Sequence, residues 1–354
     1  MDLMIEDLME QLVDGGGSDL HIASGQPPYG RFSGELRPMR DDALAEEDCN
    51  KLIFSMLNNS QRKTLEQTWE LDCAYGLKGV ARFRVNVYRQ KGSYAACLRA
   101  LGSKIPSVEL LNLPPVVLET SKRPRGLVLV TGPTGSGKTT TLAALLDHIN
   151  HTRSEHILTI EDPVEFVHES KRSLIRHREV GMHTLKFHNA LRAALREDPD
   201  VILVGEIRDQ DTLSTALEAA QTGHLVFGTL HTNSAVKTVE RVLGMFPPEE
   251  QDSVRRSLSE SLLGVIAQGL IRTTDGKRAD FHDILINTDA CKDYIQRGAL
   301  DEVEEIMERS GFDGMVTTNQ SLQALVEAGR VEPDKAVAVS LKPNELAQAL
   351  RGKS

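Results

Sequence analysis

The feature that most constrains the fold of this chain is a glycine-rich segment between a predicted strand and a predicted helix. The apolar run GLVLVT (126–131) precedes it and TTLAALLDHIN (140–150) follows it. In this setting the pattern GxxxxGK[ST] is that of a phosphate-binding loop. The residues of the loop are Gly132, Pro133, Thr134, Gly135, Ser136, Gly137, Lys138 and Thr139, and Thr140 continues it into the helix.

The residue types of this loop suit the binding of a nucleoside triphosphate. Glycines let the backbone bend around phosphates without a Cβ in the way. Backbone N–H groups of the loop and of the helix N-terminus point at phosphate oxygens. Lys138 supplies a positive charge to the β- and γ-phosphates, and the Thr139 hydroxyl is placed to coordinate Mg²⁺. We therefore predict ATP and Mg²⁺ as the bound groups.

From residue 126 onward, short apolar runs alternate with stretches of helical pattern. The runs are GLVLVTG (126–132), HILTIED (156–162), VILVGE (201–206) and HLVFGTL (224–230). Buried parallel strands that alternate with helices predict an α/β sheet covered on both faces. Because the pattern after about residue 250 is helical, we predict an α/β domain over 116–354 with a helical C-terminal region.

The first hundred residues follow a different pattern. Residues 2–13 place apolar side chains on one helical face, SDLHIASG (18–25) alternates as a strand, and 42–68 has a helical pattern. Two alternating runs flank Lys91–Gly92, which predicts a hairpin. We predict an α+β domain over 1–100 and, from the three prolines of 101–115, a linker between the domains.

Acidic residues follow two of the predicted strands. Glu206 ends VILVGE, where a carboxylate holds Mg²⁺ directly or through water. Glu161, Asp162 and Glu165 lie just beyond the strand before it, and ligands of open α/β sheets bind at such strand ends. Hydrolysis needs one carboxylate to deprotonate water. Residue chemistry does not choose among these three, and a turn or capping role describes at least one of them.

Histidines and arginines supply the other candidates. His224 and His231 stand at the two ends of a predicted strand within 222–232, where they would sense the γ-phosphate or pack as satisfied core residues. Their wide separation disfavours a metal site. Arg82 and Arg84 share one face of a predicted strand. They would either face solvent or reach the γ-phosphate of a neighbouring subunit.

Composition excludes several classes of protein. The net charge of −10 argues against general binding to a phosphate backbone, so no nucleic-acid partner is expected. The sequence lacks an apolar stretch of about 20 residues and a signal-peptide pattern, and we expect the chain to stay in the cytoplasm. Its four cysteines form no CxxC pair, which predicts reduced, packed thiols and no zinc site.

The order of the motifs resembles that of the secretion ATPases. GPTGSGKTTT, TIEDPVEF, LREDPDVILVGEIRD and TGHLVFGTLHT are similar to the Walker A motif, Asp box, Walker B motif and His box of that superfamily. Within it, the chain is most similar to the ATPases that retract type IV pili, over most of residues 1–290. The resemblance implies a PAS-like N-terminal domain, a RecA-like ATPase domain, and a homohexamer whose nucleotides lie near an adjacent subunit.

The same resemblance assigns roles to individual residues. It places the catalytic glutamate at Glu165 and the Walker B glutamate at Glu206. It also implies that the motor powers twitching motility and contacts an inner-membrane pilus platform protein. Its two box histidines fall on His224 and His231, and its N-terminal arginines on Arg82 and Arg84.

Two alternatives to retraction remain at this point. One is a pilus-assembly, type II secretion or DNA-uptake ATPase of the same superfamily, although such proteins usually carry a four-cysteine zinc module that this sequence lacks. The other is an ATP-binding regulatory module without motor activity. The stretch 290–295 and the tail beyond it depart from the pattern of the retraction ATPases.

Overall fold

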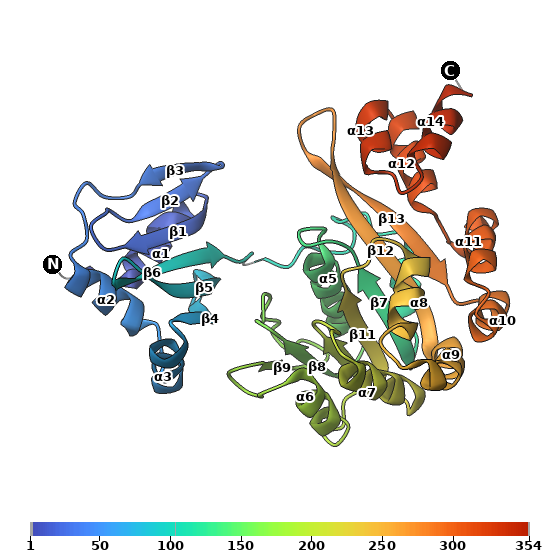
Figure 1. The fold of residues 1–354 in the computed structure, drawn as a ribbon, viewed down its shortest axis with the longest axis horizontal. Helices are drawn as coiled ribbons and strands as arrows, with labels where there is room; N and C mark the ends of the chain where they lie inside the picture. The colour runs from blue at the N-terminus through green and yellow to red at the C-terminus, as the bar shows by residue number, and fades with distance from the viewer. Residues whose placement is uncertain (1–2, 103, 353–354) are drawn as a thin grey trace. The chain divides into compact units, whose positions relative to one another are not determined.

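The computed structural model describes residues 3–102 and 104–352, which divide into two compact units (Figure 1). The first unit contains the chain up to Ile105 together with the short segment Pro163–Val167. The second unit contains Pro106–Asp162 and the chain from His168 onward. The segment Pro163–Val167 thus belongs, by its contacts, to a different unit from the residues on either side of it.

The first unit is built on an antiparallel sheet with strand order β3-β2-β1-β6-β5-β4. Apolar residues of its helices and of one face of the sheet form its core, which confirms the predicted α+β class. The strands are β1 Gly17–Ala23, β2 Tyr29–Phe32, β3 Glu35–Pro38, β4 Glu70–Leu77, β5 Ala81–Gln90 and β6 Ser93–Ala100, and the helices are α1 Ile5–Asp14, α2 Glu46–Ser55 and α3 Asn59–Thr68.

The predicted hairpin at Lys91–Gly92 is confirmed. Gln90 pairs with Ser93, and the two residues between them have φ values of +47° and +85°, as a two-residue hairpin turn requires. Along β5, Phe83 points into the core, because side chains alternate across a strand. The same alternation places Arg82 and Arg84 on the opposite face.

The second unit contains a larger sheet with strand order β13-β12-β7-β11-β10-β8-β9. All neighbouring strands pair in parallel except β12 and β13, which pair antiparallel. The strands are β7 Gly126–Thr131, β8 His156–Glu161, β9 Leu174–Glu179, β10 Val201–Val204, β11 Leu225–Leu230, β12 Leu262–Arg272 and β13 Arg278–Ile286. The four runs predicted to be parallel strands are therefore confirmed.

Helices cover both faces of this sheet, as the buried strands predicted (Figure 1). One core contains apolar residues of α4 and α5 and of one sheet face. The other core contains residues of α6 to α11 and of the other face. These helices are α4 Pro115–Ser121, α5 Lys138–Thr152, α6 Phe187–Ala194, α7 Gln210–Gln221, α8 Ala235–Leu243, α9 Pro248–Ser261, α10 Asp289–Arg297 and α11 Leu300–Arg309.

The helical prediction after residue 250 is wrong for 262–286, which form β12 and β13. Helix α9 ends at Ser261, and the next residue already belongs to β12. β12 lies between β7 and β13, and its residues pack into the cores on both faces of the sheet, so it shows no alternation of polar and apolar residues. Such a run cannot be told from a buried helix by periodicity alone, because the pairing that makes it a strand is long-range.

The C-terminal region beyond β13 is helical, as predicted. After α10 and α11 come α12 Thr318–Glu327, α13 Pro333–Val339 and α14 Pro343–Arg351. Apolar residues of α12 to α14 pack with Ile271 of β12 and Ala279 of β13 in a small separate core. Among the described residues, no helix is both long enough and apolar enough to cross a bilayer.

Candidate nucleotide site

The carboxyl ends of the parallel strands place several predicted site residues at one edge of the larger sheet. Strand β7 leads into the glycine-rich loop, and its last residue, Thr131, pairs with Leu230 at the end of β11. Val204 at the end of β10 pairs with Gly228 of β11. The loop, Glu206 and His231 therefore share this edge, where open α/β sheets bind their ligands.

The backbone of the loop has a shape that needs glycine. Gly132, Gly135 and Gly137 have φ values of +143°, +80° and +91°. A Cβ at Gly132 would lie 2.3 Å from the Gln268 carbonyl oxygen, whereas a Cβ at Gly135 would meet nothing within 4 Å. The Lys138 ammonium is buried and donates to the carbonyl oxygens of Gly132 and Pro133, at 2.7 and 3.1 Å.

Gln268 of β12 supports the loop, and the sequence reasoning missed it. Its side-chain amide donates to the Ser136 carbonyl oxygen at 2.7 Å. The other amide atom, Oε1, and the Ser136 hydroxyl are buried and have no hydrogen-bond partner among the described residues. Unpartnered buried polar atoms at a glycine loop fit a site for a polar ligand such as a phosphate. The signal in the sequence is one polar residue inside the apolar run 262–271.

Replacing Gln268 with leucine is expected to weaken nucleotide binding about 5- to 10-fold. The buried Ser136 carbonyl loses its donor, so the loop spends less time in the conformation that binds nucleotide. Titration with a fluorescent ADP measures the change in Kd. The matched control is Gln251→Leu, since the Gln251 amide also donates to a carbonyl, that of Phe246 at 3.1 Å. An unchanged Kd in the Gln268 variant would contradict a supporting role.

Glu206 lies just beyond β10 in a cluster of charged side chains. Its carboxylate accepts from Arg208 at 2.6 and 2.7 Å and lies 3.1 Å from His231 Nε2. Burial raises the pKa of Glu206, but the hydrogen bonds and positive charge of Arg208 and His231 outweigh burial and hold the pKa below its usual value. The cluster therefore keeps Glu206 ionised and connects it to the end of β11.

The three acids left open by the sequence lie in different surroundings. Glu161 ends β8 and is buried, with Oε1 3.8 Å from His177 Nδ1. A Cβ on Gly205 would lie 3.1 Å from the Glu161 Cα, so β8 and the segment before Glu206 pack closely. Asp162 also belongs to the second unit, whereas Glu165 lies in the segment Pro163–Val167 that packs with the first unit.

The structure does not bring every predicted residue to this edge. His224 lies before the first residue of β11, where its Nδ1 is 2.9 Å from the Ala219 carbonyl oxygen. At about 3.3 Å per residue, the strand separates His224 from His231 by about 20 Å. In this structure His224 therefore does not contact the phosphate loop of its own chain, as a γ-phosphate sensor would.

The two candidate arginines belong to the first unit. Arg82 donates from Nε to the Val164 carbonyl oxygen at 2.9 Å, which attaches β5 to the segment that contains Glu165. Arg84 is exposed on the same face of β5. The exposed guanidinium of Arg84 is accessible to another molecule.

The side chains near the loop offer few ligands for a metal ion. Among the described residues, no group of three or more His, Cys, Asp or Glu side chains could hold a metal ion by itself. Mg²⁺ usually takes only one or two protein oxygens together with phosphate oxygens and water. The oxygens of the Thr139 hydroxyl and the Glu206 carboxylate are ligands of the kind that such a site needs.

Comparison with known proteins places the chain in a family. The model of the family described as "Type II/IV secretion system protein" matches residues 87–344, well over half of the chain. The chain belongs to the type II/IV secretion system family. The match includes the phosphate loop, the Glu206 cluster and His231.

Two known proteins are similar to the chain over most of their length. The chain is 49% identical to the "Type IV pilus retractation ATPase PilT" of Pseudomonas aeruginosa over 321 residues, which cover 91% of this chain and 93% of that protein. It is 48% identical to the "Twitching motility protein" of Neisseria gonorrhoeae, covering 87% and 83% of the two chains.

A solved structure of this family supports the fold. The crystal structure described as the pilus retraction motor PilT with bound ADP superposes with a TM-score of 0.92 and 45% identity, covering 98% of this chain and 100% of that one. The predicted RecA-like domain and the smaller α+β domain before it are thereby confirmed.

Proposed function

We propose that the chain is an ATP-hydrolysing motor that powers the retraction of type IV pili. One observation carries this proposal: nearly half of the residues are identical to those of a pilus retraction ATPase along nine-tenths of both chains. The loop with Lys138 and the Glu206 cluster at one sheet edge supply the groups that phosphoryl transfer needs. The working form would be a homohexamer on the cytoplasmic face of the pilus base, in contact with an inner-membrane platform protein.

Within this proposal, the residues of the second unit have distinct tasks. Residues 132–140 bind the phosphates of ATP through backbone N–H groups, and Lys138 adds positive charge. Thr139 would ligate Mg²⁺ directly, and Glu206 through water, because its oxygens are already paired with Arg208 and His231. When bound, Mg²⁺ neutralises charge on the phosphate oxygens.

Other roles follow the family assignment. Glu165 would accept the proton of the attacking water as general base. His231 would report a change at Glu206 to the segment that follows β11, because the two side chains are in contact. Arg82 or Arg84 would supply positive charge to the nucleotide of an adjacent subunit.

Deleting the gene is expected to leave cells with more surface pili and without twitching motility, because assembly continues while disassembly stops. Counting pili by electron microscopy and measuring twitching zones test this. A bald mutant would instead support an assembly ATPase of the same family. If the purified chain bound nucleotide but released no phosphate at steady state, the regulatory module would be the better account.

A further inference from the structure

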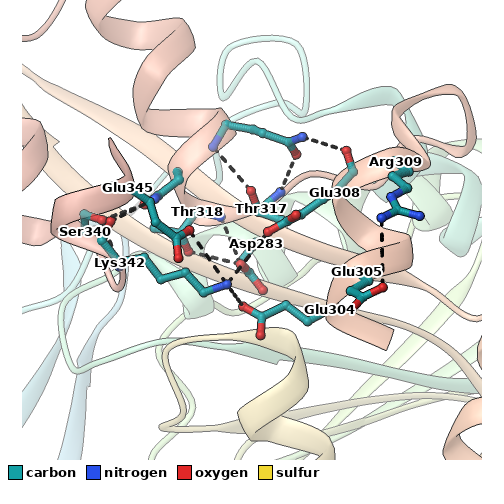
Figure 2. A network of polar contacts seen from close by, with 12 residues as sticks. Asp283, Glu304, Glu305, Glu308, Arg309, Thr317, Thr318, Ser340, Lys342 and Glu345 are labelled. Carbon is teal, nitrogen blue, oxygen red and sulfur yellow. Dashed lines mark hydrogen bonds and ion pairs between the residues drawn. The ribbon is translucent and has the colours of Figure 1, made fainter. Parts of the chain in front are cut away.

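A single buried carboxylate connects two helices of the second unit. Asp283 lies on β13 and is 7% exposed. Its Oδ1 accepts from the Ala235 backbone N–H at 2.7 Å. Its Oδ2 accepts from the Thr318 backbone N–H at 2.9 Å and from the Thr318 hydroxyl at 3.1 Å (Figure 2). Ala235 and Thr318 are the first residues of α8 and α12, respectively.

This arrangement suits a carboxylate and no other side chain of the same shape. The first N–H groups of a helix have no partner within the helix and carry partial positive charge. An ionised carboxylate presents only acceptors, so it can serve two helix N-termini at once. Burial holds the pKa of Asp283 above its ordinary value, and the three donors reduce that rise without cancelling it. In all three contacts the Asp283 oxygens accept, which is the pattern that suits a carboxylate. An asparagine would turn an NH₂ group toward one of the two helices.

On one side, Asp283 is connected to the edge that carries the phosphate loop. Helix α8 begins four residues after His231. Within it, the Thr238 hydroxyl lies 2.6 Å from that of Thr232 and 3.3 Å from that of Thr131, and it donates to the Ser234 carbonyl at 2.7 Å. Thr131 directly precedes Gly132, so hydroxyl contacts join the start of the loop to the first turn of α8.

On the other side, α12 contacts the segment between α13 and α14. Asn319 in its first turn donates to the Lys342 carbonyl at 3.1 Å and accepts from the Ser340 hydroxyl at 2.6 Å. The Lys342 ammonium lies 2.8 Å from Glu304 of α11 and within 4 Å of Glu308 and Glu345 (Figure 2). A shift of the first turn of α12 would therefore move α11 and α14 with it.

We propose that Asp283 couples the nucleotide state of the loop 132–139 to the C-terminal helices α11 to α14, by holding the first turns of α8 and α12 on one carboxylate. It would act as a positioning residue, since it lies on β13 and touches none of the loop residues. The inference rests on the proposed function in one respect, that the loop binds nucleotide.

The test is hydrogen–deuterium exchange of the full-length protein with and without MgADP. In the wild-type protein, MgADP is expected to slow exchange in peptides that cover 132–140, 232–240 and 316–326. In Asp283→Asn, protection of 132–140 should remain, while the change induced by MgADP over 316–326 should fall at least about 5-fold, because one helix start loses its acceptor.

Two control variants separate coupling from general loosening. Asp280→Asn removes a half-buried carboxylate from the same strand, one that accepts no hydrogen bond from a helix start among the described residues. Lys342→Ala removes the ion pairs of the C-terminal helices and leaves Asp283 intact. Both should keep the response of 316–326 to MgADP. If either loses it as fully as Asp283→Asn, the coupling role is wrong.

A second variant cuts the connection without removing the carboxylate. Thr318→Pro deletes both donors to Oδ2, and proline suits the first position of a helix when the residue before it is extended. Thr317 has φ −89° and ψ 158°, so it meets that condition. Thr318→Pro should lose the response of 316–326 to MgADP, whereas Thr318→Ala, which keeps the N–H bond, should retain most of it.

The outcomes distinguish the two proposals. Fluorescent-ADP titration comes first, and a wild-type protein that binds no nucleotide would contradict the proposed function. If nucleotide binds but 316–326 never responds, or if Asp283→Asn and Thr318→Pro both respond like the wild type, only the coupling role of Asp283 is contradicted.

Discussion

ATP hydrolysis should be lost when Lys138 is replaced with alanine, with turnover falling at least about 100-fold, the scale expected when a charged group that stabilises the transition state is removed. The ammonium group is buried in the glycine-rich loop, where it donates to the carbonyl oxygens of Gly132 and Pro133. Alanine removes the positive charge and both hydrogen bonds of the ammonium, although the Pro133 carbonyl keeps the Ser136 N–H as a donor at 3.2 Å. Steady-state release of phosphate measures the effect.

The control for this variant is Lys277→Ala, because the Lys277 side chain is 82% exposed and lies in the β12–β13 turn. It should hydrolyse ATP at the wild-type rate. The circular dichroism spectra and melting temperatures of the two variants should be alike, so that the loss of ATP hydrolysis can be assigned to chemistry and not to unfolding. Normal turnover in the Lys138 variant would remove the basis for the phosphate-loop assignment.

Glu165→Gln is expected to slow turnover at least about 100-fold while nucleotide affinity changes little, since glutamine keeps the size of the side chain but cannot accept the proton of water. Rapid-quench measurement of a single turnover isolates the chemical step, and fluorescent-ADP titration gives the affinity. A fall in affinity equal to the fall in rate would mean that Glu165 acts in binding.

Two companion variants test the acids that residue chemistry left open. Asp162→Asn and Glu161→Gln each remove one acid that precedes the segment Pro163–Val167. Glu161 is buried beside His177, so its replacement should lower thermal stability more than it lowers the single-turnover rate. If Asp162→Asn or Glu161→Gln stops the chemical step while Glu165→Gln does not, the base is misassigned.

Short-range patterns were enough to find the main elements of the site. The loop 132–139 was recognisable because its glycines, lysine and threonine are contiguous and lie between a strand and a helix. The hairpin at Lys91–Gly92 is likewise a local signal, since a two-residue turn fixes its own register. Glu206 and His231 were candidates because each follows a short apolar run, and both runs are buried parallel strands in the structure.

What the sequence alone determined about this protein is thus what neighbouring residues decide: the phosphate loop, the strands that lead to it, and the α+β and α/β character of the two units. Tertiary structure decided the rest. Gln268 supports a loop residue 132 positions away, and 262–286 are strands because β12 pairs with β7 and β13. Asp283 meets two helix starts that are far apart in the chain. Such contacts depend on which segments fold together, and periodicity along one segment carries no information about its partner.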